Sequence, residues 1–144
     1  MKGISIYEKS EELGFFIIKE KLPSLNEVIN KNRTNRYAGA KMKKDIENRI
    51  SLYIQKALSD GTLHKQNVPC EIVIWWFEKT KKRDVDNIQS AQKFILDALK
   101  NNNILIDDSQ KYVKQVHHCV VHTGLDEVRV VLISAREESE WRKI

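Results

Sequence analysis

The stretch VPCEIVIWWFEKT, residues 68–80, decides the fold. Its apolar side chains run almost without interruption from Cys70 to Glu78 and do not alternate with polar ones. Alternation is typical of a strand with one solvated face, whereas a continuous apolar run indicates a strand that is buried on both faces. We therefore expect this segment at a central position in a β-sheet.

The flanking segments predict the remaining elements of a single α+β (α/β) domain, with a mixed sheet of about four strands and two main helices. We expect that domain to occupy residues 1–144, with a core over about 15–135 and a polar tail over 136–144. The expected elements are a strand over 15–20, a short helix from Leu25 with a capping box of Ser24 and Glu27, a helix over 40–59 that stops at Gly61, a helix over 87–101 capped by Asp86, and an antiparallel hairpin of 111–123 and 126–135. Gly39 is expected to interrupt the chain before the second of these helices.

Composition excludes several classes of protein. Of 144 residues, 41% are hydrophobic and 31% charged, which is typical of a folded globular chain and not of a disordered one. No apolar run approaches the roughly 18 residues of a membrane helix, and the N-terminus lacks the apolar centre of a signal peptide, so we expect a cytoplasmic protein without membrane partners. Cys70 and Cys119 lie far apart and are expected to be buried thiols.

Positive charge is concentrated in two runs within a net charge of +5. The segment 31–44 holds no acidic residue, and a second run precedes a pair of aspartates. One such run is typical of a solvated surface, but two, one beside carboxylates, favour a polyanionic partner such as a nucleic-acid backbone. The candidate phosphate-binding residues are Lys31, Arg33, Arg36, Lys41, Lys43, Lys44, Lys81, Lys82 and Arg83.

Two pairs of aspartates carry the candidate chemistry. Asp84 and Asp86 are two residues apart, and Asp107 and Asp108 follow after a predicted helix and a short apolar stretch, which is enough chain to travel out and return. We therefore expect both pairs to converge at one end of the sheet, as oxygen ligands for Mg²⁺. The alternatives are structural, because aspartate also favours helix caps and turns, and Asp84 has Arg83 as a neighbouring partner.

Lys93 lies on the same expected helical stripe as Asp86, Ser90 and Asp97. A lysine on that stripe is placed to reach a phosphate held by the metal. The alternative is a surface ion pair with Asp97, four residues later.

The motifs KKRDVDNIQSAQKFILDAL, residues 81–99, and DDSQ, residues 107–110, resemble the RusA family of Holliday junction resolvases, which are metal-dependent endonucleases of phage and prophage origin. The segment LPSLNEVINKNRTNRYAGAKMKK, residues 22–44, is similar to the Gram-positive branch of that family. The resemblance covers about residues 15–135.

The resemblance implies an α/β fold, a homodimer, dependence on Mg²⁺ (or Mn²⁺), and symmetric paired cuts in four-way DNA junctions. It also implies that Asp84, Asp86 and Asp108 are the essential metal-binding carboxylates, with Asp107 beside them, and that Lys93 is the essential lysine. In the best-known members the lysine follows the second aspartate by four positions, where this chain has Ser90. Two alternatives remain open, a nuclease with broader branched or flap substrates and a non-catalytic protein that binds branched DNA.

Overall fold

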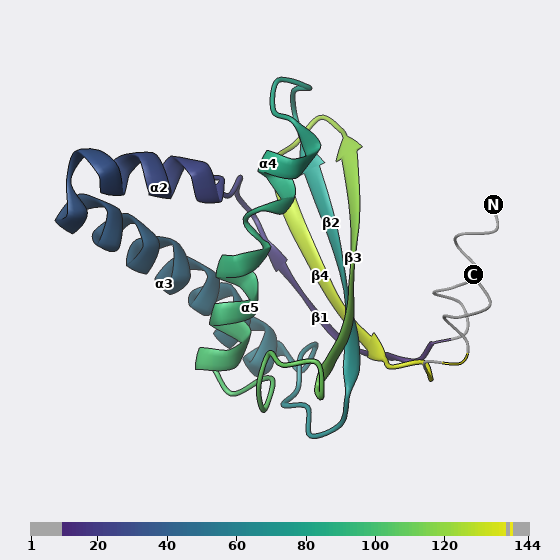
Figure 1. Cartoon of the computed structure of the whole chain (residues 1–144). Coiled ribbons are helices and arrows are strands. Elements are labelled where there is room, and N and C mark those ends of the chain that lie inside the picture. Colours follow the sequence, from purple (N-terminus) through teal and green to yellow (C-terminus); the bar gives the residue numbers. More distant parts are fainter. Residues whose placement is uncertain (1–9, 138, 140–144) are drawn as a thin grey trace.

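The computed structural model describes residues 10–137 and 139, and they form one α+β domain around a four-stranded mixed sheet (Figure 1). The strands are β1 (Glu12–Ile18), β2 (Cys70–Glu78), β3 (Val113–His122) and β4 (Glu127–Ser134), in the spatial order β1-β4-β2-β3. The predicted bounds of β2 and its interior position are confirmed. The strand predicted over 15–20 forms, but its bounds are those of β1. Part of the predicted tail, residues 138 and 140–144, lies outside the described residues.

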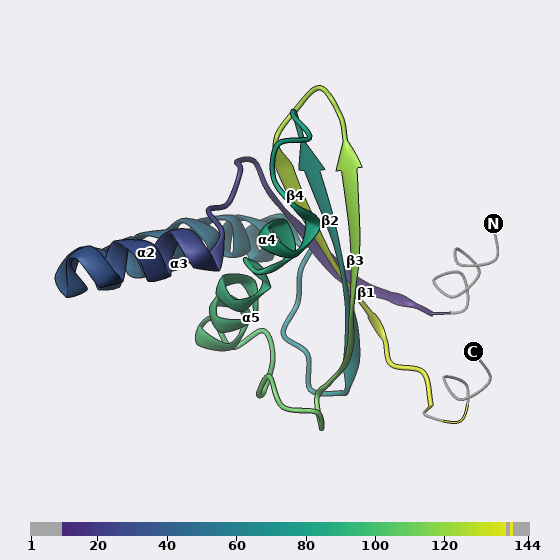
Figure 2. The same cartoon turned by 45° about the horizontal axis from the view of Figure 1, so that its top comes forward.

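The helices of residues 10–137 lie on one face of the sheet (Figures 1 and 2). They are α2 (Leu25–Thr34), α3 (Arg36–Asp60), α4 (Val85–Gln89) and α5 (Gln92–Asn101). The core between the two layers contains Phe16, Trp76, Ile50, Phe94 and Ile95, each almost fully buried. No helix among the described residues is long and apolar enough to cross a bilayer.

The predicted hairpin of the last two strands is wrong, because β2 lies between them. β3 is parallel to β2 along one edge, and β4 is antiparallel to β2 along the other. The connection between β3 and β4 crosses the end of β2 (Figure 1) and bonds to it, since the Thr123 N–H donates to the Glu78 carbonyl at 2.9 Å. An interior strand needs partners on both edges for its backbone groups, and this requirement overrides the short turn.

The predicted break at Gly39 is also wrong, because α3 begins at Arg36 and the basic segment is helical. Gly39 serves the packing of α2 against α3: a Cβ at this position would lie 2.5 Å from the Cβ of Asn32. The other helix signals are confirmed. Ser24 and Glu27 form the capping box of α2, and Gly61 ends α3 in the left-handed conformation with a φ of 78°.

The helix predicted over 87–101 is two helices that meet at Ser90 and Ala91. The Ser90 hydroxyl donates to the Asn87 carbonyl at 2.6 Å and accepts from the Leu25 N–H at 3.0 Å, so the break is held by a contact with α2. Asp86 was expected to be the N-cap, but it lies in the first turn of α4, and Asp84 occupies the cap position.

Candidate functional site

Asp84 and Asp86 lie on a turn that is clamped to the end of β2. Arg83 donates to both carboxylate oxygens of Glu78, at 2.8 and 3.0 Å, and to the Leu22 carbonyl at 2.9 Å. Both side chains of this ion pair are largely buried. Arg83 was predicted to bind phosphate, and in this structure its guanidinium is engaged by Glu78 and by the Leu22 carbonyl.

The far side of the same turn is fixed to α2. Besides the contact of Leu25 with Ser90, the Asn26 amide donates to Asn87 Oδ1 at 2.8 Å. In contrast, Asp84 and Asp86 are exposed, and neither carboxylate has a hydrogen bond or ion pair with another described residue. The surroundings are therefore rigid while the two carboxylates stay available to a ligand.

Asp107 and Asp108 lie at the opposite end of the sheet. Because β3 is parallel to β2, with Cys70 opposite Val113 and Glu78 opposite His122, the segment before β3 lies beside the start of β2. Asp84 instead follows the end of this nine-residue strand, so the two pairs lie toward opposite ends of β2, a strand of about 30 Å.

The expected convergence of the two aspartate pairs within one chain is therefore wrong. In a parallel strand–helix–strand unit, the helix returns the chain to the end where the first strand began. The sequence signalled the helix and the return, but not that β3 would run parallel to β2.

The donors present fit a divalent metal only in part. Among the described residues, no group of three or more His, Cys, Asp or Glu side chains is arranged to hold a metal ion. Asp84 and Asp86 offer hard oxygen ligands, and Mg²⁺ commonly takes one or two carboxylates together with waters and phosphate oxygens. The third expected ligand, Asp108, is distant from them within the chain.

Lys93 lies in the first turn of α5, three residues after Ser90. Its ammonium donates to Asp97 at 3.1 Å, and this hydrogen bond and charge raise its pKa, with smaller contributions from the charges of Asp108 and Glu47. The interruption at Ser90 and Ala91 ends the stripe that was expected to link it to Asp86.

Sequence reasoning missed Glu47, which α3 contributes to this group. Burial raises the pKa of Glu47, and the charge of Asp97 raises it further, while Lys43 and Lys93 oppose the shift. The Lys43 ammonium lies 4.0 Å from a carboxylate oxygen of Glu47, and Lys43 comes four residues earlier on the helix. This spacing of opposite charges in the sequence could have indicated the ion pair.

Asp107 has partners of its own. It accepts a hydrogen bond from the backbone N–H of Asp108 at 2.9 Å and lies 3.5 Å from Lys100. The backbone N–H and the lysine charge hold the pKa of Asp107 below its usual value. The alternative that the aspartate stabilises a turn therefore describes Asp107 well. The Asp108 side chain has fewer hydrogen bonds and ion pairs within the chain than that of Asp107.

Most of the predicted phosphate-binding cations lie on the hairpin of α2 and α3, which projects beyond the sheet (Figure 1). Lys43 is paired with Glu47, and no ion pair to a described residue engages the others. The exposed, unpaired members of the hairpin are Lys31, Arg33, Arg36, Lys41 and Lys44. Lys81 and Lys82 are also exposed, next to the first aspartate pair.

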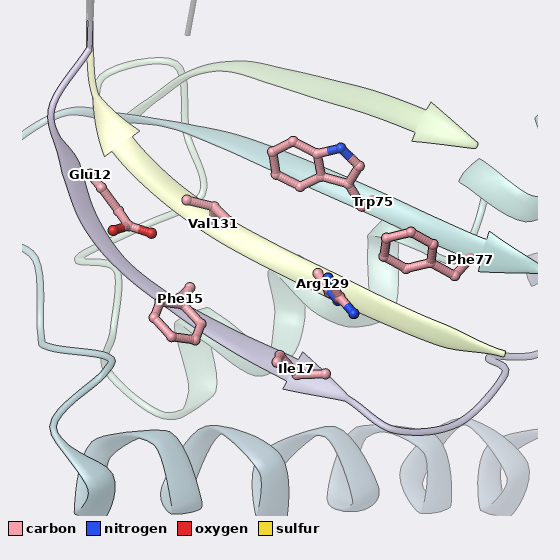
Figure 3. Close-up of a pocket in the computed structure, with 7 residues that line it drawn as sticks. All are labelled: Glu12, Phe15, Ile17, Trp75, Phe77, Arg129 and Val131. Carbon is pink, nitrogen blue, oxygen red and sulfur yellow. The ribbon is translucent and has the colours of Figure 1, made fainter. Parts of the chain in front are cut away.

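The sheet face opposite the helices carries an apolar depression (Figure 3). Phe15, Trp75, Phe77 and Val131 line it, and the guanidinium of Arg129 lies 4.6 Å from the centre of the Phe77 ring. Glu12 is the one carboxylate among its lining residues. This depression therefore suits an apolar contact and has no cluster of oxygen ligands for hydrolysis.

A separate charged cluster is structural. The buried Glu71 accepts hydrogen bonds from His117 Nε2 at 2.7 Å and from the backbone N–H of Arg136 at 2.8 Å. Burial alone would raise the pKa of Glu71, but these hydrogen bonds and the charge of Arg136 lower it overall.

Of the cysteines, Cys70 is buried, with its pKa raised to about 11 by burial and by the charge of Glu71, whereas Cys119 is half-buried and free.

In a comparison with known families, residues 10–132 match a family described as Endodeoxyribonuclease RusA. The matched segment contains β1 to β3, most of β4 and both aspartate pairs. A comparison with curated proteins gave no match.

Proposed function

Because the chain belongs to the RusA endodeoxyribonuclease family, we propose that it cuts four-way DNA junctions by hydrolysing a phosphodiester bond at each of two symmetric positions. The observation that carries this proposal is the pair of exposed, unpaired carboxylates of Asp84 and Asp86 on a clamped turn, beside the exposed Lys81 and Lys82. The segment 22–44 supports placing the protein in the Gram-positive phage branch of the family.

Two symmetric cuts call for two sites related by a two-fold axis, which a homodimer supplies. The separation of the aspartate pairs supports the same conclusion, because each pair lies near one end of β3, one of the two edge strands of the sheet. Edge strands present unpaired backbone groups to a second strand. If two copies align their β3 edges antiparallel, Asp84 and Asp86 of one copy come close to Asp108 of the other, at both ends of the interface.

The metal ligands in this arrangement are Asp84 and Asp86 from one copy and Asp108, with Asp107 beside it, from the other. A bound Mg²⁺ or Mn²⁺ would supply a Lewis acid and an activated water for hydrolysis. The chain itself holds the two carboxylates in place through Arg83 and Asn87.

Lys93 is the lysine of the same shared site, a role that the family resemblance assigns to it. Its hydrogen bond to Asp97 fixes the ammonium, which then stabilises negative charge that develops on the phosphoryl oxygens.

The exposed cations of the α2–α3 hairpin bind the DNA arms through phosphates. Contacts of this kind position the DNA without reading its sequence, and they weaken as salt rises because binding releases counterions. Sequence preference at the cut must come from other groups.

The proposal is tested by incubating a labelled synthetic four-way junction, a linear duplex and a flap with the protein and Mg²⁺. We expect paired symmetric nicks in the junction alone, loss of nicking with Asp86→Asn, and full activity with Asp45→Asn, which changes an exposed aspartate of α3. Equal cutting of all three substrates would instead favour a broader branched-DNA or flap nuclease. Tight, salt-dependent junction binding without product would favour a non-catalytic DNA-binding protein.

A further inference from the structure

The tip of the α2–α3 hairpin is a rigid, one-residue turn. Asn35 joins the two helices, its N–H donates to the Lys31 carbonyl at 2.9 Å, and its side-chain oxygen accepts from the Ala38 N–H at 3.2 Å. Thr34 adds a hydroxyl bond to the same Lys31 carbonyl at 2.9 Å. These bonds satisfy backbone groups at both helix ends, so the first turn of α3 has a fixed orientation.

Close packing adds to this rigidity. Gly39 lies against Asn32 with no space for a Cβ, and its N–H donates to the Asn35 carbonyl at 3.0 Å. The two helices therefore touch within one turn of the tip, and side chains there project from a stiff support.

Tyr37 projects from this support without a role in the fold. Its side chain is 79% exposed, the largest value among the exposed large hydrophobic residues of the described chain. It has no hydrogen bond, ring contact or ion pair with another described residue. Burial of an aromatic side chain usually stabilises the folded state strongly, and the exposed Tyr37 does not contribute in this way in the free protein.

The surroundings of Tyr37 are uniformly cationic. Arg36 precedes it, Lys41 follows four residues later on the same helix, and Arg33 lies in the last turn of α2. All three are exposed and have no ion pair with a described residue, and no acidic residue occurs from 28 to 44. An exposed ring framed by free cations is the combination that binds unstacked nucleic-acid bases together with their phosphates.

We propose that Tyr37 distinguishes a branch point from linear duplex by stacking on a base that the crossover exposes, while Arg33, Arg36 and Lys41 bind the flanking phosphates. The inference rests on the proposed function and adds the group that selects the substrate. In a linear duplex, both faces of every interior base are covered by neighbouring bases, so only phosphate contacts remain. At a branch point, a base can present a free face, and stacking on it needs no particular sequence.

Tyr37 acts on substrate choice and not on the chemical step. The start of α2 contacts α4 through Leu25 and Ser90, and the tip lies ten residues further along this helix, or roughly 15 Å. The Tyr37 ring is therefore remote from Asp84 and Asp86. Since it does not reach the reacting bond, Tyr37 acts as a specificity-determining residue.

The test compares Tyr37→Ala and Tyr37→Trp with Leu52→Ala, which removes a side chain that is 71% exposed on the same helix. Affinity for a four-way junction and for a linear duplex of the same sequence is measured by fluorescence anisotropy without divalent metal. We expect Tyr37→Ala to weaken junction binding by roughly 5- to 100-fold and to leave duplex binding within about twofold. Tyr37→Trp and Leu52→Ala should keep the junction preference of the unmodified protein.

A second readout places 2-aminopurine at the crossover. Its fluorescence should change when the unmodified protein or Tyr37→Trp binds, and stay constant with Tyr37→Ala at saturating protein. A junction preference that survives Tyr37→Ala would overturn the inference alone. Equal affinity of the unmodified protein for junction and duplex would overturn the proposed function and this inference with it.

Discussion

Mixing two inactive variants tests whether the site is shared between subunits. Asp86→Asn removes a proposed ligand beyond the end of β2, and Asp108→Asn removes one before β3, toward the other end of the nine-residue β2. If each site combines the two ends from different copies, a mixed dimer has one site that lacks both carboxylates and one that is intact. If each site belongs to a single chain, every site in the mixture lacks one carboxylate.

The expected recovery follows from counting sites. Each mixed dimer has one intact site of two, so purified mixed dimers should regain about half of the sites of the unmodified protein, and an unpurified random mixture, in which half of the dimers are mixed, about a quarter. The two variants are co-expressed with different tags, mixed dimers are purified through both tags, and nicking of a labelled junction is measured. The product should be a junction nicked in one strand, because each mixed dimer has a single working site.

A matched control combines Asp84→Asn with Asp86→Asn, which lie at the same end of the sheet and cannot complement each other in a shared site. Nicking by this control pair, or no nicking by purified mixed dimers of Asp86→Asn and Asp108→Asn, would refute the shared site.

Four further predictions concern single positions. Arg36→Ala should lower the slope of log affinity against log salt for DNA binding by about 1, and an unchanged slope would exclude a phosphate contact there. Lys93→Ala should reduce kcat by about 100-fold or more with junction affinity unchanged, whereas Lys56→Ala, which removes another lysine paired with an aspartate four residues later, should be silent in junction cleavage. Gly39→Ala forces a Cβ to within 2.5 Å of Asn32 and should destabilise the fold by about 1–3 kcal/mol in thermal denaturation, and an unshifted midpoint would contradict the packing. The partners of Glu71 hold its pKa in the folded state below the ordinary value of 4.5. The ionised Glu71 therefore contributes fully to stability above pH 4.5, and this contribution is lost as the pH falls through the folded-state pKa. Glu71→Ala should therefore cost roughly 3 kcal/mol at pH 7 and much less in acid, and equal losses at both pH values would disprove the account.

Local signals in the sequence predicted the elements that they themselves stabilise. The apolar run of Cys70–Glu78, the capping box of Ser24 and the left-handed Gly61 act within a few residues, and all three appear where expected. Gly39 and Ser90 misled because their partners, Asn32 and Leu25, lie in another helix. The sequence alone does not distinguish a glycine that permits close helix packing from one that ends a helix.

The candidate site shows the same limit. Spacing and resemblance predicted Asp84, Asp86 and Asp108 as candidate site residues, but their positions depend on whether β3 pairs with β2 or with β4. Strand pairing is decided by the packing of the entire sheet, and no short segment encodes it. Once β3 is known to be parallel to β2, the opposite placement of the two pairs follows from topology alone.

The position of β2 between β3 and β4 also has a kinetic consequence. The residues 123–126 that join β3 and β4 have the length of a hairpin loop, so the two strands can pair early, as a local hairpin. That hairpin occupies the edges that β2 needs, and it must open before the native sheet forms. We expect refolding to include a slow phase from this misregistered intermediate, and inserting a few glycines into 123–126 should disfavour the local pairing and shorten the phase.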